Sequence, residues 1–257
     1  MEFIDTHTHL FSEQFDDDID EVIQRSLNEG ITKMYLPNIN SDTIDSMMKL
    51  SARYPENCFP LMGLHPCDVK EDYQREIDLV KEWHAKHKFY AVGEIGIDLF
   101  WDKTFVEQQK DAFRQQIQLA KKIQLPIVIH VRDSFDEVFE IVNDENDDSL
   151  FGIFHCFTGD IDQAKQILNY GGFKLGLGGV LTFKNSGLDK TISQIDMEHL
   201  VLETDSPYLA PVPYRGKRNE SVYLKLVAEK LAEIKNLPLS EVAKITTENA
   251  NRVFYGK

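Results

Sequence analysis

The chain has 257 residues, of which 42% are hydrophobic, so it is long enough to bury a sizeable core. It carries 28 basic and 43 acidic residues, which give a net charge of −15 at pH 7. This charge argues against a protein that binds a polyanion over its whole surface, because such binding needs Lys and Arg at the phosphates. It leaves open a local basic patch, or a site in which metal ions supply the positive charge.

The cysteines and the N-terminus bear on the cellular compartment. The three cysteines, Cys58, Cys67 and Cys156, fit neither a CxxC motif nor a disulfide framework. A reducing cytosol is their simplest environment. No apolar run approaches about 18 residues, and the first five residues contain no basic segment of a signal peptide. We therefore expect a cytoplasmic protein without a membrane partner.

Eight short apolar runs alternate with longer amphipathic segments along the chain. The runs are rich in Val, Ile, Leu and Phe and show little polar alternation, which is typical of parallel strands buried on both faces. The predicted strands are residues 2–6, 33–37, 59–64, 89–95, 127–131, 152–157, 173–177 and 200–204.

The segments between these runs carry helical patterns. Residues 16–29 begin with an acidic turn, residues 41–53 begin at a serine cap, and residues 104–123 repeat apolar residues at helical spacing. After the eighth run, residues 221–235 and 240–254 predict two further helices.

Strands that alternate with helices in this way predict an α/β fold. Eight such units at this length favour a TIM-like (β/α)8 barrel with extra C-terminal helices, and an open doubly wound sheet is the alternative. The sequence shows no linker or low-complexity segment. We therefore expect residues 1–257 to form a single barrel domain.

Residues able to bind a metal ion follow five of the eight predicted strands. His7 and His9 lie two positions apart, so their side chains share a face of the first strand. A lone histidine is more often a core residue, but six chance placements at the same end of five strands are hard to reconcile with a purely structural role. The carboxyl ends of barrel strands open on one face, so we expect these side chains to converge. They are His7, His9, Glu94, His130, His155 and Asp205. Four imidazoles and two carboxylates suit Zn, Ni, Co or Mn at two adjacent sites.

Three further residues lie close to this predicted centre. Asp5 shares the face of His7 and His9 one layer deeper, and Glu203 shares a face with Asp205. We expect both carboxylates to orient ligands from outside the centre. His65 follows the third strand and is either a substrate contact or an ordinary loop histidine.

A basic segment follows the eighth strand in an otherwise acidic chain. Arg215, Lys217 and Arg218 lie within four positions. They indicate a phosphate-bearing substrate, with a solvated run of charges as the alternative. Arg132, two positions after His130, is expected to join them. The pair 100–101, Phe-Trp, either stacks on a base or packs a loop.

These residues resemble the TatD family of metal-dependent hydrolases. The resemblance rests on the segments 5–9 (DTHTH), 93–98 (GEIGID), 129–133 (IHVRD), 154–159 (FHCFTG), 203–209 (ETDSPYL), 215–219 (RGKRN) and 247–254 (TENANRVF), so it extends over nearly the whole chain. Small departures are Ser221, where the family often has proline, and Val131, where a small polar residue is common.

The resemblance implies a TIM-like barrel with a divalent metal centre. It implies His7, His9 and Asp205 on one metal ion, His130 and His155 on the other, and Glu94 bridging the two. It also implies DNase activity, often exonucleolytic from the 3′ end of single strands.

The resulting hypothesis is a metal-dependent hydrolase that cleaves phosphodiester bonds in DNA with a water activated by two metal ions. Glu94 and Asp205 are the expected catalytic residues, and the cofactors are two divalent ions, Mg, Mn, Zn, Ni or Co. The expected partner is single-stranded DNA or its 3′ end, and no obligate protein partner is evident. A second hypothesis is a hydrolase of a small amide, lactone or ester, which can be phosphorylated. A third is a non-enzyme whose metals hold the barrel, but structural zinc sites are closed and usually rich in cysteine.

Overall fold

The computed structural model describes residues 1–256, in which eight strands alternate with helices. All pairings between neighbouring strands are parallel. One sheet contains, in this order, β1 (Phe3–Asp5), β2 (Ile31–Pro37) and β3 (Cys58–Leu61). The other contains β4 (Val92–Asp98), β5 (Ile127–Arg132), β6 (Gly152–Phe154), β7 (Phe173–Leu177) and β8 (Leu200–Leu202).

The two sheets meet at two seams. Met62 and Val92 form a parallel bridge between the end of β3 and the start of β4. At the other seam, the backbone N–H of Thr6 donates to the carbonyl of Leu202 at 3.0 Å, which joins β1 to β8. The first and last strands are therefore neighbours, and the predicted TIM-like barrel is confirmed.

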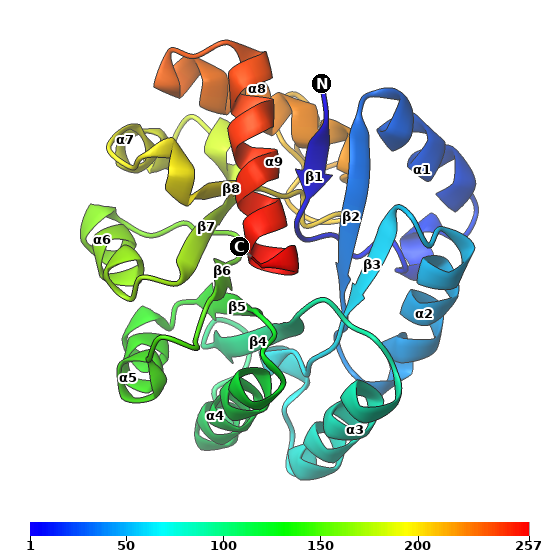
Figure 1. The fold of residues 1–257 in the computed structure, drawn as a ribbon, viewed down its shortest axis with the longest axis vertical. Coiled ribbons are helices and arrows are strands. Elements are labelled where there is room, and N and C mark those ends of the chain that lie inside the picture. The colour runs from blue at the N-terminus through cyan, green and yellow to red at the C-terminus, as the bar shows by residue number, and fades with distance from the viewer. Residues whose placement is uncertain (257) are drawn as a thin grey trace.

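The helices pack around the strands, as Figure 1 shows. They are α1 (Ile19–Asn28), α2 (Ile44–Arg53), α3 (Tyr73–Lys86), α4 (Val106–Ile123), α5 (Phe135–Glu145), α6 (Ile161–Asn169), α7 (Leu188–Ser193), α8 (Leu224–Lys235) and α9 (Leu239–Tyr255). The predicted C-terminal helices correspond to α8 and α9. No helix within residues 1–256 is long and apolar enough to cross a membrane.

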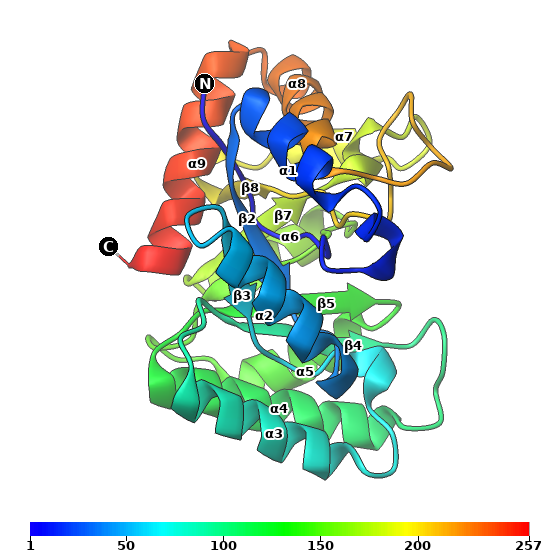
Figure 2. The ribbon, with the colours of Figure 1, turned by 90° about the vertical axis from the view of Figure 1, so that its right-hand side faces the viewer.

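The last helix, α9, covers one end of the barrel. Its residues Ala250, Val253 and Phe254 join a cluster of buried side chains inside the barrel. Six of the strands contribute residues to this cluster, and Ala91, directly before β4, is also part of it. The ring of Phe254 stacks on that of Tyr35, with centroids 3.6 Å apart. Asn249 donates to the carbonyl of Leu200, at the start of β8, so α9 lies at the amino ends of the strands. In Figure 2, α9 lies on one side of the barrel and the arrowhead of β5 points away from it.

Several strands are shorter than the sequence predicts. The predicted runs 152–157 and 200–204 end as strands at Phe154 and Leu202. Beyond them the backbone turns, since Cys156 and Asp205 have φ angles of 45° and 58°, in a left-handed region that no strand uses. His155, Glu203 and Asp205 therefore lie on the segments that follow the strands.

Candidate metal centre

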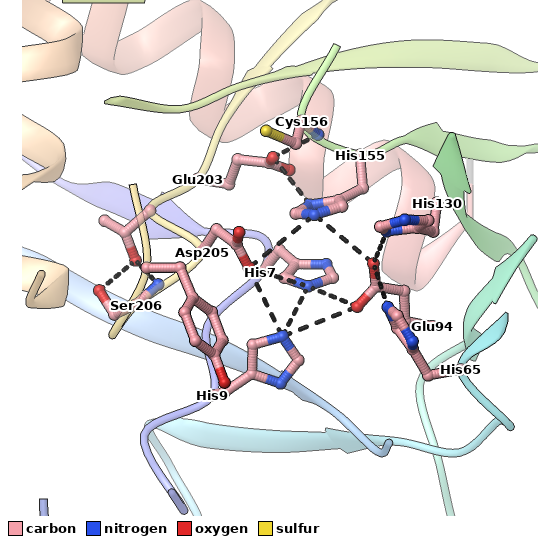
Figure 3. A network of polar contacts seen from close by, with 12 residues as sticks. His7, His9, His65, Glu94, His130, His155, Cys156, Glu203, Asp205 and Ser206 are labelled. Carbon is pink, nitrogen blue, oxygen red and sulfur yellow. Dashed lines mark hydrogen bonds and ion pairs between the residues drawn. The ribbon is translucent and has the colours of Figure 1, made fainter. Parts of the chain in front are cut away.

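The structure brings the six predicted side chains together at the carboxyl ends of the strands (Figure 3). Five of them lie at or just beyond the ends of β1, β5, β6 and β8 and surround the Glu94 carboxylate of β4, which is only 2% exposed. Glu94 lies within β4, whose seven residues are all buried. A carboxylate at such a position needs partners for its charge, and the histidines supply them through its two oxygens.

The first cluster surrounds Oε2 of Glu94. His7 Nε2 lies 3.1 Å from this oxygen and 3.2 Å from His9 Nε2. His9 Nε2 lies 3.7 Å from the same oxygen. Oδ1 of Asp205 is 3.7 Å from His7 Nε2 and 3.5 Å from His9 Nε2. Ligand atoms about 2.1 Å from one tetrahedral ion stand about 3.4 Å apart. The atoms of His7, His9 and Glu94 therefore have the spacing of ligands around a single ion, and Asp205 Oδ1 lies at a similar distance from both histidines.

The charge state of this cluster also suits a cation. Burial lowers the pKa of His7, which favours its neutral form with a free lone pair. Burial opposes ionisation of Glu94, but His7, His65 and His155 outweigh it and hold its pKa well below the ordinary value. The pKa of Asp205 is lowered in the same way, against the effect of burial, by its histidine neighbours. Four electron-pair donors at this spacing repel one another unless a positive charge lies among them.

The second cluster surrounds the other oxygen of Glu94. His130 Nδ1 lies 2.8 Å from Oε1, and His155 Nε2 lies 3.6 Å from it. His65 Nε2 is also 3.6 Å from Oε1, and its ring centroid is 4.7 Å from that of His130. His65, Glu94 and His130 together can hold an ion. The histidine expected as a substrate contact therefore belongs to the same cluster as the expected ligands.

Two carboxylates hold the outer nitrogens of these histidines. Asp98 Oδ2 lies 2.9 Å from His130 Nε2, and Glu203 Oε1 lies 2.8 Å from His155 Nδ1. The hydrogen bond between His130 and Asp98 is of the kind that fixes the tautomer and the orientation of a metal-binding imidazole, and His155 and Glu203 form an ion pair. Burial opposes protonation of His155, but Glu203 and Glu94 outweigh it and raise its pKa to about 10.

Sequence reasoning missed Asp98 as a site residue. Its pKa falls to about 2, because the hydrogen bonds from His130 and from the backbone N–H of Trp101 and Phe100 outweigh the effect of burial. The available signal was its spacing from Glu94, since residues four apart on a strand point to the same face.

Glu203 lies against Gly176 of β7. A Cβ atom at Gly176 would stand 2.2 Å from Glu203 Oε2, which is too close for any side chain. The backbone N–H of Cys156 donates to Glu203 Oε1. The absence of a side chain at position 176 therefore gives Glu203 its place beneath His155.

Asp5 acts on the backbone rather than on the imidazoles. Its carboxylate accepts hydrogen bonds from the backbone N–H and hydroxyl of Thr204 and from the hydroxyl of Ser221, at 2.9, 2.6 and 2.7 Å. It also accepts the N–H of His7 at 3.3 Å. Burial raises the pKa of Asp5 to about 7. This network ties the segment of Asp205 to that of His7, and Ser221, at a position where proline is common in the resembling family, supplies one of its donors.

The structure gives Arg218 a different partner from the one expected. Its guanidinium donates to both carboxylate oxygens of Asp18 at 2.7 Å and to Glu220 at 3.0 Å. Arg218 is thus held by two carboxylates of the same chain, and its contact with a phosphate stays a prediction. Arg215 and Lys217 remain exposed, and the Arg215 guanidinium lies 4.1 Å from the ring centroid of Phe183.

Arg132 is exposed at the end of β5, beyond His130. Its guanidinium lies 3.9 Å from the ring centroid of Phe100 and 5.2 Å from that of Trp101. Arg132 also lines an open pocket of about 650 Å³ between the loops that follow β4, β5 and β6.

Comparisons with known proteins agree over almost the full length of the chain. A family model described as TatD related DNase matches residues 4–255. The uncharacterized metal-dependent hydrolase YabD of Bacillus subtilis is 41% identical over 251 residues, which cover 97% of this chain and 98% of YabD. The corresponding hydrolase YcfH of Escherichia coli is 29% identical over 259 residues, or 99% of this chain and 96% of YcfH. The crystal structure of YjjV, a TatD homologue from Escherichia coli, matches with a TM-score of 0.91 at 28% identity and covers 98% of each chain.

Proposed function

The chain belongs to the TatD family of DNase-related, metal-dependent hydrolases, and from this premise we propose that it hydrolyses phosphodiester bonds in DNA. We propose further that it acts as an exonuclease from the 3′ end of single strands. The observation that carries the proposal is the division of the Glu94 carboxylate, whose Oε2 belongs to one ligand cluster and whose Oε1 belongs to the other.

In this proposal the two clusters hold two divalent ions. His7, His9, Glu94 and Asp205 would hold one ion, and Glu94, His130 and His155 would hold the other, with His65 beside the second. When bound, such ions polarise phosphoryl oxygens and lower the pKa of water, so that a nucleophile is available near neutral pH.

Asp205 is the residue that we assign to proton transfer. All its contacts with histidines use Oδ1, so Oδ2 is available to accept the proton of an attacking water. Its side chain is 14% exposed, whereas those of His7 and Glu94 are 0% and 2% exposed. Asp205 is thus the member of its cluster that faces the mouth of the barrel, where water and substrate arrive.

Arg132, Arg215 and Lys217 are the cations assigned to the substrate. Each is exposed; Arg132 is the last residue of β5, and Arg215 and Lys217 follow β8. In a chain of net charge −15 this short cationic rim limits binding to the end of a strand, because no broad basic surface holds the rest of a nucleic acid.

The test is to strip the protein of metal, add end-labelled single-stranded DNA and restore Mg, Mn, Co, Ni or Zn singly. We expect stepwise shortening from the 3′ end with at least one ion, and none with a folded Glu94→Ala/His130→Ala variant. Intact DNA under every ion, with the fold and bound ions verified, would contradict the proposal. A small phosphorylated ester, amide or lactone would then be the substrate to test, since the acidic surface of the chain favours a small ligand over a polyanion.

A further inference from the structure

Two large aromatic side chains lie exposed on the loop after β4. Phe100 is 50% exposed and Trp101 is 69% exposed. Their rings meet edge to face at 4.9 Å, and the guanidinium of Arg132 lies over both. An adjacent aromatic pair held out in water under a cation offers flat faces on which another planar group can stack.

Phe100 of this pair lines the open pocket of about 650 Å³, a volume in the range of small-molecule sites, whereas Trp101 lines a separate cavity of about 100 Å³. The pocket lies between the loops that follow β4, β5 and β6. Asp98 is the last residue of β4, His130 lies in β5, and His155 directly follows β6. Arg132 follows His130 by two positions, so its Cα lies about 7 Å further along the strand. A substrate group in the pocket would be next to the second ligand cluster.

The charges of the pocket select what it can hold. Beside Arg132 it is lined by three carboxylates, Asp133, Asp136 and Glu137. This excess of negative charge disfavours a phosphate inside the pocket and leaves the phosphate on the side of Arg132. Carboxylates accept hydrogen bonds from exocyclic amino groups such as N4 of cytosine.

We propose that this pocket is a nucleobase subsite. An unpaired base adjoining the scissile phosphate stacks on Phe100, meets the perpendicular ring of Trp101 edge to face, and turns its amino-bearing edge to the acidic wall. The inference rests on the proposed function and deepens it by naming the substrate as a strand with a free base. In a duplex the amino edge is already paired and the faces of the base are covered.

Binding can be followed through Trp101 itself. The chain has two tryptophans, and Trp83→Phe leaves Trp101 as the fluorophore. We expect short oligodeoxycytidine, added in EDTA so that it stays intact, to quench this fluorescence. Oligodeoxythymidine, which lacks the amino group, should bind roughly tenfold more weakly, as befits the loss of one hydrogen bond to a charged acceptor. In an Asp136→Ala/Glu137→Ala background the preference for cytosine should disappear. Equal quenching by both strands, or no quenching, would overturn the subsite.

Steady-state kinetics of Trp101 variants separate this inference from the proposed function. Trp101→Ala should raise KM about tenfold for a single strand with a normal end, with rescue by Trp101→Phe. The penalty should be absent for a strand whose terminal nucleotides are abasic. Tyr255→Ala, which removes a 50% exposed aromatic side chain at the opposite end of the barrel, is the matched control and should leave KM unchanged.

If DNA is cleaved but the fluorescence of Trp101 and the KM of its variants show no dependence on the base, the subsite alone is wrong. If Trp101 binds cytosine strands that the wild type never cleaves, the proposed function alone is wrong.

Discussion

Asp98 joins His130 to the aromatic loop of the barrel mouth through the two oxygens of one carboxylate. Oδ2 lies 2.9 Å from His130 Nε2, while Oδ1 accepts the backbone N–H groups of Phe100 and Trp101 at 2.9 and 3.1 Å. The orientation of a ligand histidine and the position of the exposed aromatic pair therefore depend on the same buried side chain.

Asp98→Asn should weaken the centre without unfolding the barrel. The amide preserves the size of the side chain and one acceptor for the loop, but it removes the negative charge that polarises His130. We expect metal affinity or kcat/KM to fall about 10- to 100-fold, as for other outer partners of metal-binding histidines. Metal titration and steady-state kinetics measure this effect. Unchanged values would mean that Asp98 serves only the loop.

Removal of the metal should lower the melting temperature, and adding the ion back should raise it as the concentration of free ion increases. The clusters are built of mutually repelling donors, so an ion that binds only the folded chain stabilises it, by about 2.7 kcal/mol at 100 times its dissociation constant. Thermal melts of stripped protein with increasing Zn or Mn measure the shift. Glu94→Gln, which weakens both clusters at once, should show a much smaller shift. A melting temperature independent of the ion in the wild type would contradict a metal centre.

Gly176→Ala should displace Glu203 from His155. The new Cβ would stand 2.2 Å from Glu203 Oε2, and such overpacking costs about 1–3 kcal/mol. We expect activity to fall about 10- to 100-fold. Gly178→Ala is the matched control, because its Cβ would meet its nearest neighbour at 3.7 Å, an ordinary contact. Equal behaviour of the two variants in urea melts and kinetics would show that Gly176 is not required for the position of Glu203.

Asp18→Asn should destabilise the chain at pH 7 but not in acid. The hydrogen bond from Arg218 lowers the pKa of Asp18 below its ordinary value. A carboxylate with a lowered folded-state pKa contributes stability above its unfolded pKa, and that stability is lost as the pH falls through the folded value. We expect a cost of about 0.5–1 kcal/mol at pH 7. Urea titrations of both proteins, from pH 7 down to the lowest pH at which the wild type is folded, measure the free energy of unfolding. The difference in this free energy between wild type and variant should shrink below about pH 4. A constant difference would assign the cost to packing.

Phe254→Ala should destabilise the barrel more than it affects the centre. The ring is 6% exposed and stacks on Tyr35 at the end of the barrel away from the clusters. Loss of a buried phenylalanine costs about 3–5 kcal/mol. Denaturant melts should show this loss, while kcat at low temperature stays within about twofold of the wild type. A large fall in kcat in the folded variant would mean that the packing of α9 against the barrel also shapes the site.

The sequence was sufficient to predict the barrel and the convergence of six side chains, because both follow from strand periodicity and from the shared direction of parallel strands. Its predictions were less accurate where the chain leaves the strands. The ion pair of Arg218 involves Asp18, two hundred positions away and directly before the first helix, and no local pattern pairs them. Asp98 was missed for a different reason, since it lies at the end of a run whose other carboxylate already explained the motif.

The hydrogen bond between Thr6 and Leu202 has a consequence for biosynthesis. It spans 196 positions, and it brings His7 and His9 to Asp205. A nascent chain exposes both histidines early, yet Asp205 emerges from the ribosome only when most of the chain has been translated. The buried cluster inside the barrel is completed later still, when Phe254 of α9 has been synthesised. We therefore expect the ion of the first cluster to bind after synthesis, when the segments of His7 and Asp205 have met.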